Sequence, residues 1–171
     1  INRFITVNTD LLLKAFVDGA IARLGPPPVP FAFLVMGSEG RREQTLCTDQ
    51  DNAIVYEDPP EAERGAAAAY FLHLGETVCD WLNDAGYAHC KGDMMARNKQ
   101  WCRPLSAWLG LFRTWVRSLE AEDILLTKVI FDFRWGYGSQ PLVDTLRAGV
   151  REELKDNPRF FTQLAGDILT Y

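Results

Sequence analysis

Two short apolar runs, separated by a polar segment, constrain the fold of this chain more than any other feature. Residues 31–36 and 53–56 have the length and the composition of buried strands. Between them, residues 39–46 contain good helix formers and no proline, which predicts a short helix with Ser38 as its N-cap. The sequence therefore predicts the order strand, glycine turn, helix and strand.

The glycine turn predicts a place where a phosphate binds. Gly37 and Gly40 carry no side chain, so the backbone can approach a ligand closely. After Ser38, at the start of the predicted helix, unpaired backbone N–H groups and the helix dipole together suit an anion. Arg41 and Arg42 follow, and guanidinium groups pair with phosphate oxygens. A solvated helix face is an equally good interpretation of both arginines.

Two aspartates, Asp49 and Asp51, stand one residue apart just before the second apolar run. In an extended segment they project from the same side, because strand side chains alternate between faces. Two carboxylates in one small volume repel each other unless a proton or a cation lies between them, and hard oxygen ligands suit Mg²⁺ or Mn²⁺. This acidic pair predicts a divalent-metal site close to the phosphate-binding turn. Taken alone, an Asp-x-Asp before a strand is usually a solvated loop edge.

Both features belong to a longer string of residues, in which positions 37–45 read GSEGRREQT and positions 48–52 read TDQDN. This string resembles the nucleotidyltransferase domain known as domain of unknown function 294, a member of the DNA polymerase beta-type nucleotidyltransferase superfamily. That domain is akin to the catalytic part of PII uridylyltransferase. Further similar residues extend the resemblance over roughly residues 3–165: Gly86, Tyr87, Cys90, Met95, Ala96, Asn98, Trp101, Phe131, Asp132, Phe133, Arg134, Tyr137 and Gly138.

The resemblance implies an α+β fold, in which a small mixed sheet is flanked by helices, and it implies a metal-dependent nucleotidyltransferase. Asp49 and Asp51 would be the catalytic residues and would bind Mg²⁺ or Mn²⁺, while Gly37 and Ser38 would grip the phosphates of a nucleoside triphosphate. The acceptor would be a hydroxyl group of a protein or a small molecule. Neighbouring regulatory domains of the CBS or cyclic-nucleotide-binding type are frequent in the family, so fusion to such domains in a larger signalling protein is expected. A module that senses nucleotide without turnover is the alternative.

Two departures from the superfamily pattern concern the acids. Gln50 stands between the paired aspartates, where the superfamily usually has an apolar residue. The third acid of the superfamily has no unambiguous counterpart. Asp93 is the candidate, because it follows residues 87–90, a short apolar stretch that could form a third strand. Asp132 is the competitor, although its surroundings favour a helix, and the choice between the two stays open.

The rest of the chain is predicted to be mainly helical. Amphipathic or alanine-rich patterns predict helices at residues 4–24, 61–85, 105–119, 120–134, 142–154 and 159–169. Because strands are expected only in the first part, the chain is predicted to divide into a catalytic domain at 1–103 and a helical region at 104–171. That region would be the incomplete start of a substrate-binding domain, so the chain is expected to be a fragment. Asp132 and Arg134 are expected to form an ion pair that holds the two parts together.

Charge and hydropathy exclude some partners. With 18 basic and 23 acidic residues the net charge is −5, which disfavours binding to long nucleic acid. No apolar run reaches the roughly 18 to 20 residues that span a bilayer, and no signal peptide opens the chain. A cytoplasmic protein without membrane contact is expected.

Cysteines, histidines and tryptophans are interpreted as structural. The four cysteines and two histidines do not complete a zinc-binding spacing, so buried free thiols are expected. Core or inter-domain packing is predicted for four tryptophans, at positions 101, 108, 115 and 135.

Overall fold

The computed structural model describes residues 2–43, 49–118, 130–158 and 160, and its centre is a mixed sheet of four strands. The strands lie in the order β3-β2-β1-β4, with β1 antiparallel to both neighbours and β2 parallel to β3. Their bounds are Phe31–Val35 for β1, Asn52–Tyr56 for β2, Cys102–Pro104 for β3 and Arg134–Gly138 for β4. The two predicted strands and the α+β fold class are confirmed.

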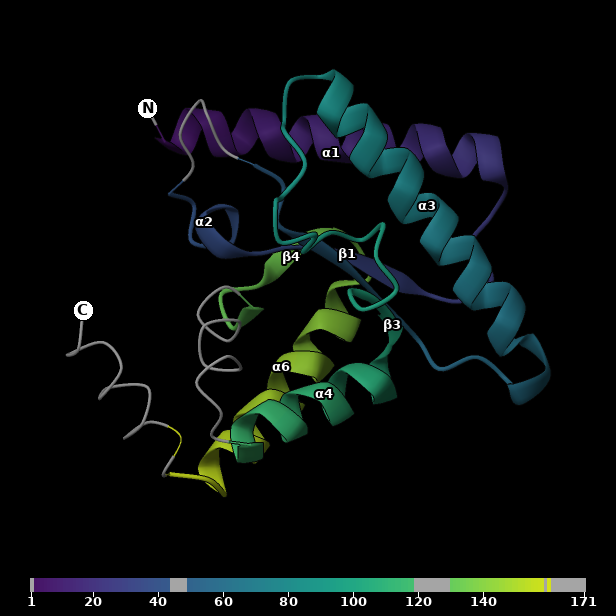
Figure 1. The fold of residues 1–171 in the computed structure, drawn as a ribbon. Coiled ribbons are helices and arrows are strands. Elements are labelled where there is room, and N and C mark those ends of the chain that lie inside the picture. The colour runs from purple at the N-terminus through teal and green to yellow at the C-terminus, as the bar shows by residue number, and fades with distance from the viewer. Residues whose placement is uncertain (1, 44–48, 119–129, 159, 161–171) are drawn as a thin grey trace.

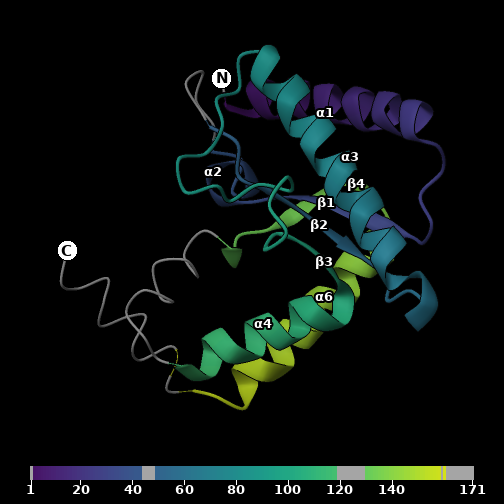
Figure 2. The ribbon, with the colours of Figure 1, turned by 45° about the vertical axis from the view of Figure 1, so that its right-hand side comes forward.

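Helices cover both faces of the sheet, as Figures 1 and 2 show. On one face α1 and α3 pack against β-strand side chains such as Phe33, and on the other face α4 and α6 pack against side chains such as Leu34. This division follows from the alternation of side chains along a strand. The bounds are Asn2–Leu24 for α1, Arg64–Asp84 for α3, Leu105–Ser118 for α4 and Gln140–Lys155 for α6.

Four of the predicted helices are therefore confirmed. The helix predicted at 61–85 opens with a 3₁₀ turn, η1 (Glu61–Glu63), before α3 begins. The helix predicted at 159–169 lies outside the described residues except for residue 160. Within the part of the chain that the structure describes, no helix combines the length and the apolar character that crossing a membrane needs.

The third strand lies at a different place from the one predicted. Residues 87–90 contribute only an isolated bridge between His89 and Gln50, whereas Cys102–Pro104 pairs with β2. Trp101 and Cys102 are both buried, so the hydrophobic effect draws this segment to the sheet. Residues 91–101, which include Asp93, connect the two places and pass the start of β2, where the N–H group of Asn52 donates a hydrogen bond to the carbonyl oxygen of Met94.

The prediction of helix alone after residue 104 is wrong at β4. The predicted helix at 120–134 lies mostly outside the described residues, and Arg134–Gly138 is a strand that pairs with β1. Two glycines alternate here with Trp135 and Tyr137, a composition poor for a helix and acceptable for an edge strand. A strand from the second part of the chain thus completes the sheet of the first part. The predicted boundary between residues 103 and 104 stays a prediction.

Candidate functional site

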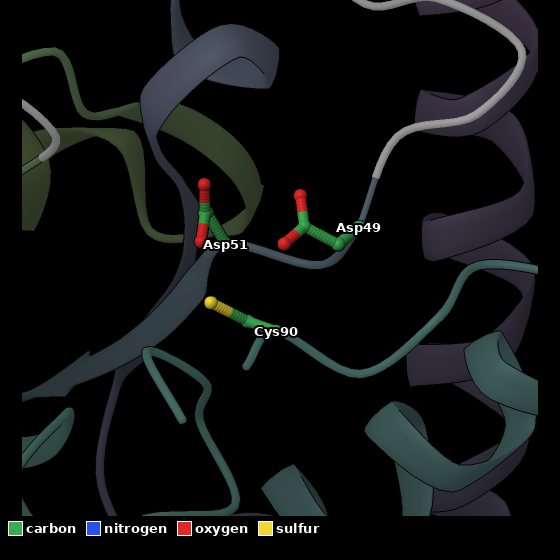
Figure 3. A group of neighbouring side chains, drawn as sticks. All are labelled: Asp49, Asp51 and Cys90. Atoms are coloured by element: carbon green, nitrogen blue, oxygen red, sulfur yellow. The ribbon is translucent and has the colours of Figure 1, made fainter. Parts of the chain in front are cut away.

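The acidic pair lies where the chain enters β2. One ligand atom each from Asp49, Asp51 and Cys90 lies within 4.8 Å of the other two. Figure 3 shows the two carboxylates turned toward one another, with the Cys90 sulfur beside Asp51. The structure therefore brings together the two aspartates that the sequence predicts as metal ligands.

Gln50 explains how the two aspartates come to share one side. Its side chain is buried, with 3% of its surface exposed, and it points away from them. The amide nitrogen donates hydrogen bonds to the carbonyl oxygens of Cys79, at 3.0 Å, and Tyr87, at 2.8 Å. A buried amide needs such partners, so the Gln50 side chain is held on one side of the segment. Because side chains alternate along an extended segment, Asp49 and Asp51 then project from the other side. The departure from the superfamily pattern at this position thus has a structural role.

Burial and charge make the acidic pair a good cation site. Burial raises the pKa of Asp51, the thiol of Cys90 donates a hydrogen bond that lowers it, and the charge of Asp49 raises it again. A cation between the carboxylates would offset the cost of burying a charged Asp51 and would reduce the repulsion between the two charges. Carboxylate oxygens suit Mg²⁺ and Mn²⁺, whereas the thiol is a softer donor. The residues present therefore fit a divalent metal ion.

The sequence did not predict that Cys90 lies beside the acidic pair. Burial raises the pKa of its thiol, which favours the protonated form that donates to Asp51. The isolated bridge between His89 and Gln50 helps bring Cys90 to the pair. No periodicity in the sequence marks such a bridge, although Cys90 was one of the residues similar to the family.

The turn after β1 contains a helix much shorter than predicted. Helix α2 spans Gly37–Gly40, and its N-cap is Met36, which makes no side-chain capping bond. The prediction of a helix at 39–46 capped by Ser38 is wrong for the described residues, which end at 43 and resume at 49. Gly37 has φ of +56°, a conformation that other residues rarely adopt, so the chain turns sharply there. Four residues give only a small dipole, so the helix-dipole argument for phosphate binding is weak.

Gly40 serves packing within the protein. A Cβ atom at this position would overlap the carbonyl oxygen of Asp132. The space left by the missing side chain is therefore filled by the backbone that precedes β4. The expectation that Gly40 makes room for a ligand is wrong.

The two arginines of the turn differ in their contacts. Arg41 donates hydrogen bonds to Asp132, at 2.7 Å, and to Glu43, at 2.8 Å. Arg42 is exposed, and its φ of +60° ends the turn. Contact of either with phosphate stays a prediction.

The predicted ion pair between Asp132 and Arg134 is replaced by two others. Asp132 pairs with Arg41, and Arg134 pairs with Asp10 of α1 through Nη2 at 2.7 Å. Asp132 lies in the turn before β4, whereas Arg134 is the first residue of β4, so the two side chains meet different partners. Both pairs still link the segment at 132–134 to the first part of the chain.

Asp93 is not brought to the acidic pair. It is exposed in a turn, and its carboxylate accepts a hydrogen bond from the Asn98 amide at 2.8 Å. Among the described residues, the group that surrounds the pair contains neither Asp93 nor Asp132. The role of Asp93 as a third metal ligand stays a prediction.

Glu39 is a buried acid that sequence reasoning did not single out. Only 7% of its surface is exposed, and among the described residues its Oε1 is a buried oxygen without a hydrogen-bond partner. Burial raises its pKa to about 7, the charge of Arg134 opposes this shift, and the charges of Asp10 and Asp51 add to it. Glu39 lines a cavity of about 10 Å³, which has room for no more than a water molecule. This cavity is too small to hold a nucleotide.

Two of the cysteines behave as the sequence predicts. Cys79 and Cys102 are buried and free, and burial raises the pKa of each thiol to about 12. The free-thiol prediction for Cys47 lies outside the described residues. Trp101, Trp108 and Trp115 are buried as predicted. Trp135 is 40% exposed, so it is not a core residue, and its alternative of inter-domain packing stays a prediction.

Comparison with known proteins gives one match. A family model described as "Putative nucleotidyltransferase DUF294" matches residues 1–122. Searches of curated proteins and of solved structures gave no match. The matched residues include the 37–42 turn and the acidic pair, whereas Asp132 and Arg134 lie beyond them.

Proposed function

Because this chain belongs to the nucleotidyltransferase family described as DUF294, we propose that it moves a nucleoside monophosphate from a nucleoside triphosphate to a hydroxyl group. The acceptor is a protein or a small molecule, as in uridylyltransferases and adenylyltransferases. We place the reaction in the cytoplasm, where nucleoside triphosphates are available. The observation that carries the proposal is the convergence of Asp49 and Asp51 beside the Gly37 turn.

The turn and the acidic pair are joined directly through the backbone. The N–H group of Met36, one residue before Gly37, donates a hydrogen bond of 2.8 Å to the carbonyl oxygen of Asp51. A triphosphate bound at the turn would therefore lie next to the carboxylates. Such closeness is what phosphoryl-group chemistry requires, because positioning and charge stabilisation supply most of its rate enhancement.

The proposed reaction is a displacement at the α-phosphorus. A bond forms between the acceptor oxygen and the α-phosphorus, the bond from that phosphorus to the bridging oxygen breaks, and pyrophosphate leaves. The hydroxyl proton of the acceptor passes to solvent. A Mg²⁺ or Mn²⁺ ion bound by the pair would neutralise charge on the attacking and leaving oxygens.

The residues of the chain have distinct parts in this proposal. Asp49 and Asp51 hold the cation, and the backbone at Gly37 and Ser38 holds the β- and γ-phosphates. The guanidinium group of Arg41 lies close enough to lower the pKa of Asp51 by its charge, which supports a role for it beside a phosphate at the same site.

The proposal is tested by transfer of label from α-³²P nucleoside triphosphates. The protein is incubated with each of the four ribonucleoside triphosphates, Mg²⁺ and a cell extract that supplies acceptors. We expect one nucleotide to label a macromolecule or a metabolite, and Asp49→Asn or Asp51→Asn to reduce the labelling at least about 100-fold. Asp144→Asn, which changes an exposed acid on α6, serves as the control. Labelling that survives either of the first two substitutions would refute the assignment of the pair.

A second function, nucleotide sensing without turnover, is favoured by one observation. The third group beside the two carboxylates is the thiol of Cys90, whereas the superfamily has a third acid there. Magnesium-dependent nucleotide binding without any transfer of label would support the sensing function. Transfer of label would exclude it.

A further inference from the structure

The start of β4 lies against the turn that we assign to the phosphates. The backbone of Val35, the last residue of β1, pairs with Arg134, the first residue of β4. From this position the Nε of Arg134 donates a hydrogen bond of 3.1 Å to the carbonyl oxygen of Glu39 in α2. Arg134 is thus linked to the turn in two ways: its backbone pairs with Val35, just before the turn, and its side chain donates to Glu39 within the turn.

The other end of the Arg134 guanidinium reaches α1. Its Nη2 donates to Asp10 at 2.7 Å and lies 4.0 Å from Oε1 of Glu39. The side chain of Arg134 is only 12% exposed, so these charge-assisted contacts are formed away from bulk water. One largely shielded cation therefore connects α1, α2 and β4.

The position of α2 depends on this cation for two reasons. Gly37 and Arg42 both have positive φ, so the turn has an unusual backbone conformation at each end. The carboxylate of Glu39 is buried, and the nearby charge of Arg134 opposes the cost of that burial. Without Arg134 the carboxylate would move toward water and take the backbone of α2 with it.

We propose that Arg134 is a positioning residue of the nucleotide site: through the carbonyl oxygen of Glu39 it holds the Gly37–Ser38 backbone in the orientation that binds phosphates. This inference rests on the proposed function. It also extends the site beyond residues 1–122, the part of the chain that the family model matches.

The test compares Arg134→Lys with Arg134→Gln in the whole protein. Lysine keeps a charge that can pair with Asp10, but it has one donor nitrogen where arginine uses two, Nε for the Glu39 carbonyl oxygen and Nη2 for Asp10. Glutamine loses the charge as well. Calorimetric titration with each of the four ribonucleoside triphosphates and Mg²⁺ measures nucleotide affinity. Titration with Mn²⁺ alone, followed by electron paramagnetic resonance, measures the metal site.

We expect the dissociation constant for nucleotide to rise about tenfold in Arg134→Lys and further in Arg134→Gln. The dissociation constant for Mn²⁺ should change less than about twofold, because Arg134 does not touch the acidic pair. The matched control is Arg147→Lys, since Arg147 also donates to a backbone carbonyl, that of Phe133 at 3.0 Å, but does not contact the turn. This control should bind nucleotide like the wild type.

Three results would overturn the inference. Wild-type nucleotide affinity in Arg134→Lys and Arg134→Gln would show that the turn is held without Arg134. A parallel loss of Mn²⁺ affinity, or an equal loss in Arg147→Lys, would show a general structural role. If the wild-type protein binds Mn²⁺ but none of the nucleotides, the proposed function fails and this inference fails with it.

Discussion

The acidic pair and the 37–42 turn lie side by side, yet the chain holds them in different ways. Asp49 and Asp51 are fixed by an immediate neighbour, Gln50, whose amide is bound by two carbonyl oxygens. The turn is fixed by Asp132, which precedes β4, and by Arg134, the first residue of β4, so both contacts come from a distant part of the chain. Chemistry that depends on the pair is therefore a local property of the sequence, whereas chemistry that depends on the turn is a property of the tertiary fold.

Gly40→Ala, a substitution in the 37–42 turn, is expected to cause the largest loss of stability. A methyl group at Gly40 would overlap the backbone oxygen of Asp132, and backbone cannot move aside as a flexible side chain can. We expect a loss of about 3 kcal/mol or more in the free energy of unfolding, measured by urea denaturation. Gly110→Ala is the control, because a Cβ there meets nothing within 4 Å and alanine favours the helix α4. Equal stability of the two variants would show that the close contact between Gly40 and the carbonyl oxygen of Asp132 does not constrain the turn.

A comparable effect, visible only through its pH dependence, is expected from Glu39→Gln. Burial raises the pKa of Glu39 from 4.5 to about 7, so the folded protein binds the proton more tightly than the unfolded chain does. The contribution of Glu39 to the free energy of unfolding is therefore largest below pH 4.5, where the carboxyl group is protonated in both states. It falls as the pH rises from 4.5 to about 7 and is constant above that. The fall should be about 3 kcal/mol. Glutamine does not titrate and should abolish it.

Urea denaturation of the wild type and of Glu39→Gln from pH 4 to pH 8 checks this prediction. Subtracting the two curves removes the contributions of the other acids, Asp10 and Asp51 included, as far as they are unchanged by the substitution. A difference that is independent of pH would contradict a buried Glu39 whose Oε1 accepts no hydrogen bond from the described residues, and would weaken the argument that Arg134 is needed beside it.

A smaller effect, confined to the acidic pair, is expected from Gln50→Leu. Leucine fills a similar volume but leaves the carbonyl oxygens of Cys79 and Tyr87 without the amide donor. We expect a loss of about 2 kcal/mol in stability, and weaker Mn²⁺ binding because the two aspartates are less well held. Gln140→Leu, at an exposed position on α6, should change neither quantity. Unchanged Mn²⁺ affinity in Gln50→Leu would show that the pair does not need its neighbour.

This contrast explains how much could be predicted from the sequence. The strands at 31–36 and 53–56 and the approach of Asp49 to Asp51 follow from local periodicity, and the structure shows both. The extent of α2 could not be predicted, because Gly40 faces the backbone oxygen of Asp132, just before β4, and the fit between them is a tertiary contact. Strand β4 itself was missed because an edge strand rich in glycine has no strong apolar alternation.

The partners of the two charged residues near this tertiary contact could not be predicted from the sequence either. Asp132 and Arg134, two positions apart, suggested a pair with each other, but each finds its partner on another element. Only the pairing of β4 with β1 decides which groups they meet. Long-range charge pairs of this kind have no local signal.

The smallest effect is expected from Asp132→Asn, and it tests whether the turn is held by buried or by exposed contacts. The side chains of Arg41 and Asp132 are 40% and 41% exposed, and ion pairs exposed to that extent contribute less than about 1 kcal/mol. We expect the loss of stability to stay below that value and to disappear in 1 M salt, where screening removes the remaining attraction. Urea denaturation at low and high salt measures it. A loss that persists in salt would mean that Asp132 acts together with Arg134, and a double-mutant cycle between the two positions would then show a coupling that independent contacts lack.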